Sequence, residues 1–487
     1  MEKTIFIFKS SFLALSLIAA VACESWIDVE PTDRLSEDKV YSTQKGFLQA
    51  LNGVYAEMNN NTVYGGHLSV GVIDVLAQYY DGGSENSYTY YYYPRYDYTN
   101  TGVKNTFSNV WSKMYSLISS ANIILEKCEQ TDVLPSQYQK IIKGEALAMR
   151  AMFHLDLLRL FGPVMSENAH EMAIPYVTVA DQNIQDFLTA DVVIDRIIHD
   201  LTEASGLLQS SDPVLTDGVK HTPEAGDNID FCYRQYRLNY FAVQVLLARA
   251  YLWKGDQTEA LTISENAISK AESIFPFISS SAANGSYPDR VFSSEVIFAL
   301  YNTNRINVYR KYFASTLDTR NILSFAGTLD SGRIPELYDS QNDLRYKMWS
   351  ASSEGDNDLI FNKYEDVVLK DGSTNHYCYM MPLIRLSELY LIAAECETDF
   401  SKALTYLNTL RNKRNCPNVT PRNTEELMNS ITSEFRKEMI GEGQMFFFYK
   451  RHAMQSIPNG SSSSGNMNMI MKNYVVPVPD SEIDNRL

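Results

Sequence analysis

The chain has 487 residues, of which 45% are hydrophobic and 21% are charged. This length and balance are typical of a globular protein whose core is large enough for one or two domains. The formal net charge is −17 at pH 7, and no run of lysine and arginine occurs that would follow a phosphate backbone, so we expect no nucleic-acid partner.

The N-terminus has the features of an export signal. Two lysines lie in the first ten residues, and residues 12–21 form an apolar run that is too short to span a bilayer. The sequence AVAC at residues 20–23 resembles a bacterial lipobox, in which the cysteine becomes the lipidated first residue of the mature protein. We therefore expect residues 1–22 to be a lipoprotein signal peptide, and Cys23 to carry a lipid anchor that holds the protein at a membrane.

Helical periodicity follows in the first third of the chain. Residues 43–58 and residues 107–126 each carry apolar side chains at helical spacing on one face. Residues 68–77 form a shorter apolar stretch between them. The two periodic segments are predicted to be amphipathic helices.

The most unusual segment lies between these helices, at residues 79–98. It reads YYDGGSENSYTYYYYPRYDY and contains nine tyrosines among twenty residues. Glycine, proline and asparagine within it argue against a helix. We predict a surface loop here, with a short strand at residues 90–93.

Residues 238–270 predict a pair of helices joined by a tight turn. Apolar residues lie on one stripe before Gly255 and on a second stripe after it. The small residues and Tyr251 follow the spacing of a tetratricopeptide unit, in which alanine lets two helices approach closely and glycine turns the chain. The middle of the chain is therefore predicted to contain one tetratricopeptide-like helix pair.

One such pair cannot bury its apolar stripe alone, so neighbouring pairs are expected. Two further candidates lie near residues 140–162, which end in a glycine and a proline, and near residues 384–414. Long irregular segments at residues 205–231 and 279–288 separate them. We therefore predict that residues 23–487 form a single, mainly all-α domain: a scaffold of tetratricopeptide-like helix pairs with long loops.

Strand signals are few. The clearest lie at residues 295–300 and 475–478, and the sequence NGSSSSGN at residues 459–466 is typical of a flexible, exposed loop. The fold class remains all-α, with a few short β-strands inserted.

No catalytic motif is present. The seven histidines are isolated, and no HExxH, CxxC, GxSxG, phosphate-binding loop or dinucleotide fingerprint occurs. His154 lies on an amphipathic segment and is predicted to be a structural histidine of the core. The sequence DND at residues 356–358 lacks the glycine and closing glutamate of a calcium loop. We therefore expect no enzyme, no metal and no cofactor.

The cysteines after Cys23 do not show paired short spacings. We expect most of them to be small core residues, and the sequence also allows one disulfide between two of them. These residues are Cys128, Cys232, Cys378, Cys396 and Cys416.

The tyrosine-rich segment is the candidate ligand site. A phenol ring offers a flat apolar face and one hydroxyl, which suits a sugar ring with apolar C–H faces and hydroxylated edges. The alternative is that the tyrosines pack over neighbouring helices with their hydroxyls in water. The candidate ligand-binding residues are Tyr79, Tyr80, Asp81, Asn86, Tyr88, Tyr90, Tyr91, Tyr92, Tyr93 and Arg95.

Taken together, these segments resemble the SusD/RagB family of nutrient-binding outer-membrane lipoproteins of Bacteroidetes. The resemblance covers nearly the whole chain, in family order. It is carried by YSTQKGFLQALNGVY, VWSKMYSLISSANIIL, GEALAMRAMFHLDLLRLFGPV, RLNYFAVQVLLARAYLWKGD, MPLIRLSELYLIAAE, ALTYLNTLRNKRN, EFRKEMIGEGQMFFFYKR and NYVVPVPDSEIDNR. The chain departs from the family at Gln444 and Met445, where many members have arginine, and at Phe448, where an acid is frequent.

The resemblance implies a non-catalytic lipoprotein that is anchored in the outer membrane and faces the cell exterior. It implies a SusC-like TonB-dependent transporter as partner, and oligosaccharides as ligands, with peptides for some members. It also places ligand contacts in the loop before the helix at 107–126. Two alternatives remain open at this point: peptide capture by the same fold, and a tetratricopeptide scaffold that binds another protein.

Overall fold

The computed structural model describes residues 37–181, 183–352 and 358–484. The expected leader and Cys23 lie outside these ranges, as do two residues of the DND sequence. The chain divides into two units, residues 1–50 and 51–487. The described part of the first contains α2 (Glu37–Val40) and the start of α3 (Gln44–Met58), which confirms the first predicted helix.

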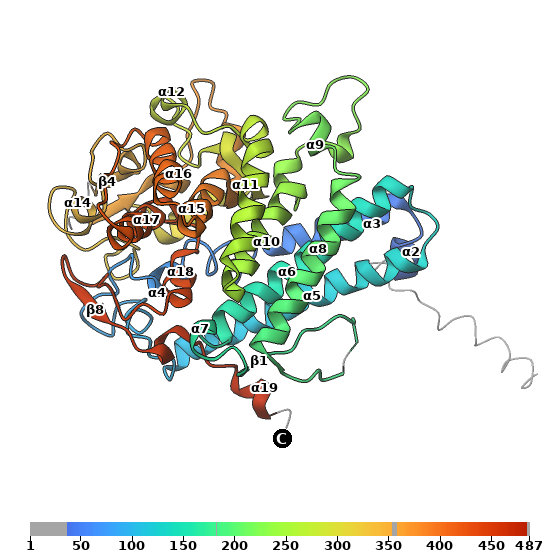
Figure 1. The fold of residues 1–487 in the computed structure, drawn as a ribbon, viewed down its shortest axis with the longest axis horizontal. Helices are drawn as coiled ribbons and strands as arrows, with labels where there is room; N and C mark the ends of the chain where they lie inside the picture. Colours follow the sequence, from blue (N-terminus) through green and yellow to red (C-terminus); the bar gives the residue numbers. More distant parts are fainter. Residues whose placement is uncertain (1–36, 182, 353–357, 485–487) are drawn as a thin grey trace, which may run out of the picture. The chain divides into compact units, whose positions relative to one another are not determined.

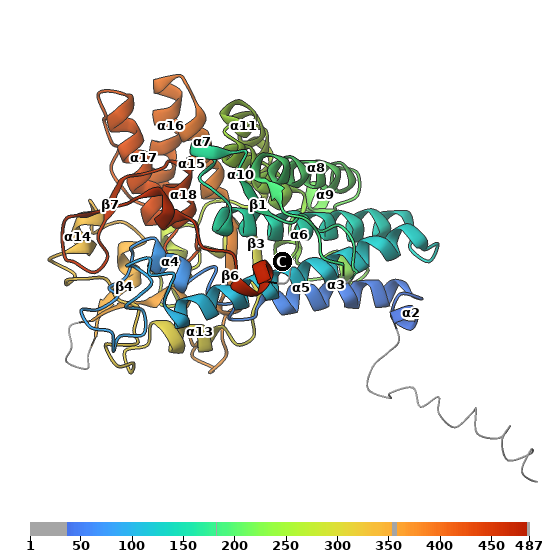
Figure 2. The same ribbon diagram turned by 90° about the horizontal axis from the view of Figure 1, so that it is seen from below.

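The second unit is built on a succession of long helices. These are α5 (Thr101–Gln130), α6 (Ser136–Phe161), α8 (Ala190–Gln209), α10 (Tyr240–Lys254), α11 (Gln257–Ile274), α15 (Leu386–Cys396), α16 (Phe400–Lys413) and α17 (Thr424–Glu438). From α5 to α16 each helix packs mainly on its neighbours in this order, so that α6 lies between α5 and α8, and α11 lies between α10 and α15, whereas α17 packs on both α15 and α16 (Figures 1 and 2). The prediction of a mainly α-helical scaffold is confirmed.

The pair α10 and α11 shows why the sequence folds in this way. The side chain of Asn239 accepts a hydrogen bond from the backbone N–H of Ala242 and so caps α10. Gly255 ends that helix with φ 91°, a left-handed conformation that suits glycine. Where the helices cross, Ala248 and Ala260 are fully buried and let the two backbones approach closely.

The segment near residues 140–162 departs from its prediction. It is part of one long helix, α6, and not a helix pair. Its partner is α8, which begins only at Ala190, after the short helix α7 (Met165–Asn168) and a loop. The intervening loop carries no helical period, so the sequence alone did not join the two helices.

The β-strands of the described residues form two-stranded antiparallel pairs. The pairs are β1 (Met172–Ile174) with β2 (Leu188–Thr189), β3 (Val296–Tyr301) with β6 (Met380–Arg385), β4 (Trp349–Ala351) with β5 (Leu359–Phe361), and β7 (Ser456–Pro458) with β8 (Asn466–Asn468). The predicted strand at 295–300 is confirmed as β3.

Two predicted strands are wrong. Residues 475–478 are irregular, because the N–H of Val476 pairs with the carbonyl of Leu160 at the end of α6 instead of with another strand. Residues 90–93 form successive turns, in which the N–H of Tyr93 donates to the carbonyl of Tyr90 at 3.1 Å. Such turns leave no extended backbone for a ladder.

Short helices occupy the loops. They are α4 (Val72–Leu76), α9 (Val214–Asp217), α12 (Ser280–Asn284), α13 (Arg305–Tyr312), α14 (Arg333–Leu337), α18 (Met445–Arg451) and α19 (Asp480–Asp484), with 3-10 turns at 229–231, 234–236, 293–295, 346–348, 362–364, 376–379 and 471–474. None of the helices in the described ranges is long and apolar enough to cross a membrane.

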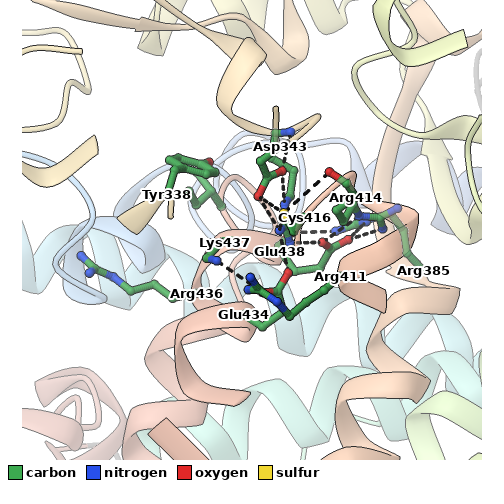
Figure 3. A network of polar contacts seen from close by, with 12 residues as sticks. Tyr338, Asp343, Arg385, Arg411, Arg414, Cys416, Glu434, Arg436, Lys437 and Glu438 are labelled. Carbon is green, nitrogen blue, oxygen red and sulfur yellow. Dashed lines mark hydrogen bonds and ion pairs between the residues drawn. The ribbon is translucent and has the colours of Figure 1, made fainter. Parts of the chain in front are cut away.

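A buried network of charges ties the strand pair β3 and β6 to the ends of α16 and α17. Arg414 donates to both oxygens of Glu295, at 3.0 and 2.5 Å, and to both oxygens of Glu438. Arg385 also contacts both carboxylates. All four side chains are at most 2% exposed. In Figure 3 the guanidinium groups of Arg385 and Arg414 converge on Glu438.

The cysteines are buried, as predicted. All five cysteines of the described residues are free thiols in the core, and no two of them form a disulfide.

Candidate functional site

The tyrosine-rich segment begins inside the protein. Tyr79 and Tyr80 are fully buried. The Tyr79 hydroxyl donates to the carbonyl of Arg436 at 2.6 Å, and its ring stacks on Phe325 with the centroids 6.0 Å apart. Burial raises the pKa of each of these two phenols well above the ordinary value of a tyrosine. These two tyrosines belong to the core, and we do not retain them in the candidate surface.

Two more tyrosines anchor the middle and the end of the segment. Tyr90 is 8% exposed and Tyr96 is 7% exposed. The Tyr96 hydroxyl donates to the carbonyl of Leu76 at 2.8 Å and accepts from the side-chain amide of Gln78 at 3.1 Å. The rings of these residues pack over their neighbours, as in the alternative interpretation, but the Tyr96 hydroxyl is bonded inside the protein and not to water.

The remaining side chains form a partly exposed aromatic surface. The rings of Tyr91 and Tyr92 meet edge to face, with their centroids 5.0 Å apart. The guanidinium of Arg95 lies 3.7 Å above the Tyr91 ring and donates to the carbonyls of Tyr91 and Gly83. Tyr88 is partly exposed beside them. We call Tyr88, Tyr91, Tyr92 and Arg95 the tyrosine face.

The other predicted residues flank the tyrosine face. Asn86 is exposed, and Asp81 accepts a hydrogen bond from the N–H of Gly83 at 2.8 Å. The hydroxyl of Tyr93 shares a hydrogen bond of 2.8 Å with Thr106 near the start of α5. Burial raises the pKa of the Tyr93 phenol, and the hydrogen bond to Thr106 opposes that rise.

Gly83 sets the position of Tyr88. Its φ is +80°, and a Cβ added there would lie 2.1 Å from Cγ of the Tyr88 ring. The ring therefore packs directly on the glycine backbone. A side chain at this position would displace it, so Gly83 is required both for the turn and for the close approach.

Two distant segments hold the loop in place. The N–H of Asp81 donates to the carbonyl of Ser324, and the N–H of Thr89 donates to that of Arg320. On the other side, the N–H of Gly460 donates to the Gln78 side chain at 3.1 Å. The loop thus has a defined conformation although it contains no helix or strand.

The sequence at 459–466, which was predicted to be flexible and exposed, is one of these supports. It forms the turn between β7 and β8, and Gly460 is buried. Arg333 donates to the carbonyls of Asn459 at 2.7 Å and Ser462 at 2.8 Å, which fixes the turn. Only residues 463–466 are exposed as predicted.

A cavity of about 640 Å³ borders the end of the tyrosine segment. Residues 96–99 form one wall, α7 with the residues before and after it forms a second, and residues 471–477 form a third. The Tyr98 hydroxyl donates to the carbonyl of Asn473 at 2.7 Å and so links two of the walls. No local sequence pattern predicts this cavity, because its three walls come from separate segments, residues 96–99, 163–171 and 471–477.

The arrangement suits recognition of a neutral, hydroxyl-rich molecule. The tyrosine face offers ring faces, phenol hydroxyls and a guanidinium, and the neighbouring cavity adds carboxylates and amides. Among the described residues, no group of three or more histidine, cysteine, aspartate and glutamate side chains is placed to hold a metal ion.

Comparisons with known proteins point to one family. A family model described as "Starch-binding associating with outer membrane" matches residues 25–218, and the SusD family model matches residues 359–486. Two SusD-like proteins of Formosa agariphila, P25 and P38, are 24% and 25% identical over 192 and 202 residues, which are 37% and 39% of this chain. The chain matches only about a third of the length of these relatives, 34% and 35% respectively.

Solved structures show the same fold. A SusD superfamily protein from Bacteroides thetaiotaomicron superposes with a TM-score of 0.70 at 22% identity, covering 91% of this chain and 98% of that one. A SusD-like carbohydrate binding protein from Bacteroides vulgatus gives 0.69 at 18% identity, covering 91% and 96%. The fold and the two family models, which together match most of the sequence, agree with the resemblance found in the sequence motifs. The chain belongs to the SusD/RagB family.

Proposed function

We propose that this protein is a non-catalytic surface lipoprotein that binds oligosaccharides and delivers them to a SusC-like TonB-dependent transporter in the outer membrane. Membership of its family supports a carbohydrate-binding role and association with the outer membrane. In this proposal Cys23 carries the lipid anchor, and the protein faces the cell exterior. The ligand contacts come from the tyrosine face and from Asp81, Asn86 and Tyr93 beside it.

The observation that carries the proposal is the tyrosine face itself. Tyr91 and Tyr92 lie edge to face on a loop that four buried tyrosines, Tyr79, Tyr80, Tyr90 and Tyr96, anchor in the protein. If each ring covers roughly 50 Å² of a sugar, its burial contributes about 1 kcal/mol. Two such contacts give weak binding to one short oligosaccharide, and several contacts along one polymer strengthen it through avidity.

Weak binding suits delivery. A ligand that is held beside a transporter mouth has a raised local concentration, yet it must leave the binding protein in order to enter the transporter. Modest affinity at each contact meets both needs.

Calorimetry with a panel of polysaccharides tests the proposal. Replacing Tyr91 and Tyr92 together by alanine removes two contacts of about 1 kcal/mol each, so we expect the affinity to fall roughly thirty-fold. Tyr301→Ala is the matched control, because Tyr301 is 50% exposed but lies outside the loop, at the end of β3. We expect its affinity to equal that of the wild type.

Unchanged binding by the double variant would remove the tyrosine face from the proposal. A parallel titration with short peptides separates the competing function. Binding of peptides, with none of the saccharides bound, would refute the carbohydrate ligand and leave the fold assignment intact.

A further inference from the structure

A second cavity lies apart from the tyrosine face. It has a volume of about 670 Å³ and lies between the start of α6, the end of α8, α9 and residues 220–231. In both ribbon views α9 is well separated from α4, the short helix that precedes the tyrosine segment (Figures 1 and 2). A ligand in this cavity would not touch the tyrosine face.

The base of this cavity is held rigidly. Asp212 lines it and is 3% exposed. Its two carboxylate oxygens accept from Nε and Nη2 of Arg234, both at 2.9 Å, and also from the backbone N–H groups of Val214 and Tyr240. Arg234 in turn pairs with Glu145 at 2.6 Å. Since every oxygen of Asp212 is engaged, the start of α9 is fixed over the cavity.

The polar walls of the cavity carry side chains that are available to hydrogen-bond a ligand. Ser136, Gln209 and Asp217 line the cavity, and within the described residues their side chains make no hydrogen bond. Lys140 lies among them and donates only to the hydroxyl of Ser210, at 3.3 Å. The cavity therefore offers a hydroxyl, an amide, a carboxylate and an ammonium group to a ligand.

An aromatic ring forms part of the wall. Phe231 lines the cavity and packs on Tyr138, with the ring centroids 4.8 Å apart. The Tyr138 hydroxyl donates to Asp230 at 3.0 Å and accepts from Asn228 at 2.7 Å, which fixes the supporting ring. The Phe231 ring is thereby held at the cavity.

The charges around the cavity favour a neutral ligand. Arg234 neutralises Asp212, and Lys220 pairs with Asp227 at 2.5 Å. Of the charged residues that line the cavity, Lys140 and Asp217 remain, and they carry opposite charges. The volume falls in the range of small-ligand sites, roughly 300–1,000 Å³. Balanced charge, mixed donors and acceptors, and one ring match the chemistry of a short saccharide better than that of an anion, a cation or an apolar molecule.

We infer that this cavity is a second saccharide site, which takes a short neutral oligosaccharide or one end of a longer chain. The choice of ligand class rests on the proposed function, but the site itself is separate from the tyrosine face. A polymer bound at both places is held by two contacts, so that loss of either one lowers the retention of polymer more than that of a trisaccharide.

The test places a reporter in the cavity. Phe231→Trp keeps an aromatic ring at the wall, and Tyr91→Ala with Tyr92→Ala in the same chain removes binding at the tyrosine face. This variant is titrated with maltotriose, cellotriose, xylotriose and laminaritriose while tryptophan emission is recorded. We expect a saturable change with at least one trisaccharide, and at least a tenfold loss of its affinity when Asp217→Ala is added.

The control is Phe277→Trp in the same loop-variant background, because Phe277 is partly buried against Tyr390, away from the cavity. We expect no saturable change there.

Calorimetry of the variant with only the two loop substitutions is the second readout. Residual trisaccharide binding that is lost when Asp217→Ala is added supports the cavity as a binding site. A flat emission signal with all four sugars, in a variant with wild-type circular dichroism, overturns this inference. Failure of the tyrosine face has a different signature, which is unchanged calorimetric affinity after the loop substitutions.

Discussion

His154 shows how one buried side chain makes stability depend on pH. Its Nδ1–H donates to the carbonyl of Arg150 at 2.8 Å, and its Nε2 accepts from the N–H of Val177 at 3.0 Å. Both nitrogens are therefore satisfied in the neutral ring, which also stacks on Tyr176 with the centroids 4.0 Å apart. This is the structural histidine that the sequence predicted. Burial lowers its pKa to about 3.

The lowered pKa gives a pH prediction. The unfolded chain binds a proton at this histidine below about pH 6.5, whereas the folded chain stays neutral down to about pH 3, so acid favours unfolding across that window. Between pH 7 and pH 5 the loss is about 2 kcal/mol. In urea titrations at the two values, His154→Gln should show a fall in unfolding free energy that is smaller by this amount.

Met152→Leu, a buried change on the same helix that removes no titrating group, is the control. It should keep the full pH dependence of the wild type. An equal fall in His154→Gln and in the wild type would show that this histidine is already protonated in the folded protein at pH 5.

At the scale of elements, the tyrosine segment and its supports act together. Gly83 allows the Tyr88 ring to pack on the backbone, and a Cβ there would clash with the ring at 2.1 Å. Gly83→Ala should therefore displace Tyr88 and weaken oligosaccharide binding, in addition to a strain of about 1–2 kcal/mol from the positive φ. Calorimetry and thermal unfolding measure the two effects separately.

Gly372 is a matched control for this substitution. Its φ is +83°, and a Cβ there would meet nothing within 4 Å. Gly372→Ala should lower the melting temperature by a similar amount and leave oligosaccharide affinity unchanged. If the two variants bind equally well, the position of Tyr88 does not matter for the ligand.

The sequence predicted elements well where their signal was local. The pair α10 and α11 follows from apolar spacing, the positions of the small residues and the glycine at 255, all within 35 residues. The β3 strand was likewise visible as an apolar run. By contrast, residues 475–478 read as a strand because of their valines, and yet they bind the end of α6, a contact that no local pattern encodes.

The candidate site was predictable only in part for the same reason. Composition located the tyrosine segment, but it could not separate the buried Tyr79 from the partly exposed rings, since identical residues alternate between core and surface within one irregular loop. Neither cavity was predicted. Their walls come from segments that are distant in sequence, such as residues 96–99 and 471–477.

At the scale of the whole molecule, charges buried between distant segments join the helical scaffold to the loops. Glu295 and Arg414 are 119 positions apart, and Arg385 and Glu438 are 53 apart, so their pairing could not be inferred from spacing. Although burial alone would raise the pKa of Glu438, Arg414 and Arg385 hold it well below its ordinary value.

The departures from the family pattern lie next to this network. Gln444 accepts a hydrogen bond from Arg159 at 3.0 Å, and Phe448 packs on Phe435 with the centroids 4.5 Å apart. Met445 is fully buried. Neutral side chains thus fill positions where many members carry charges. The ion pairs of Arg385 and Arg414 form without charged side chains at these positions.

Arg414→Met tests how much of the stability depends on this network. The change leaves Glu295 and Glu438 buried with fewer positive partners, and breaking a buried pair on one side costs about 3–5 kcal/mol. Arg422→Met is the control: Arg422 also pairs with a glutamate, Glu426, but at the surface, where water screens the interaction. Urea unfolding should show a large loss of unfolding free energy for Arg414→Met and almost none for Arg422→Met.

Because the network links β3 and β6 to α16 and α17, the loss in Arg414→Met should appear as one cooperative shift of the urea midpoint. A separate early transition in the Arg414→Met variant would mean instead that the loops and the helices unfold independently, and that the buried charges do not join them.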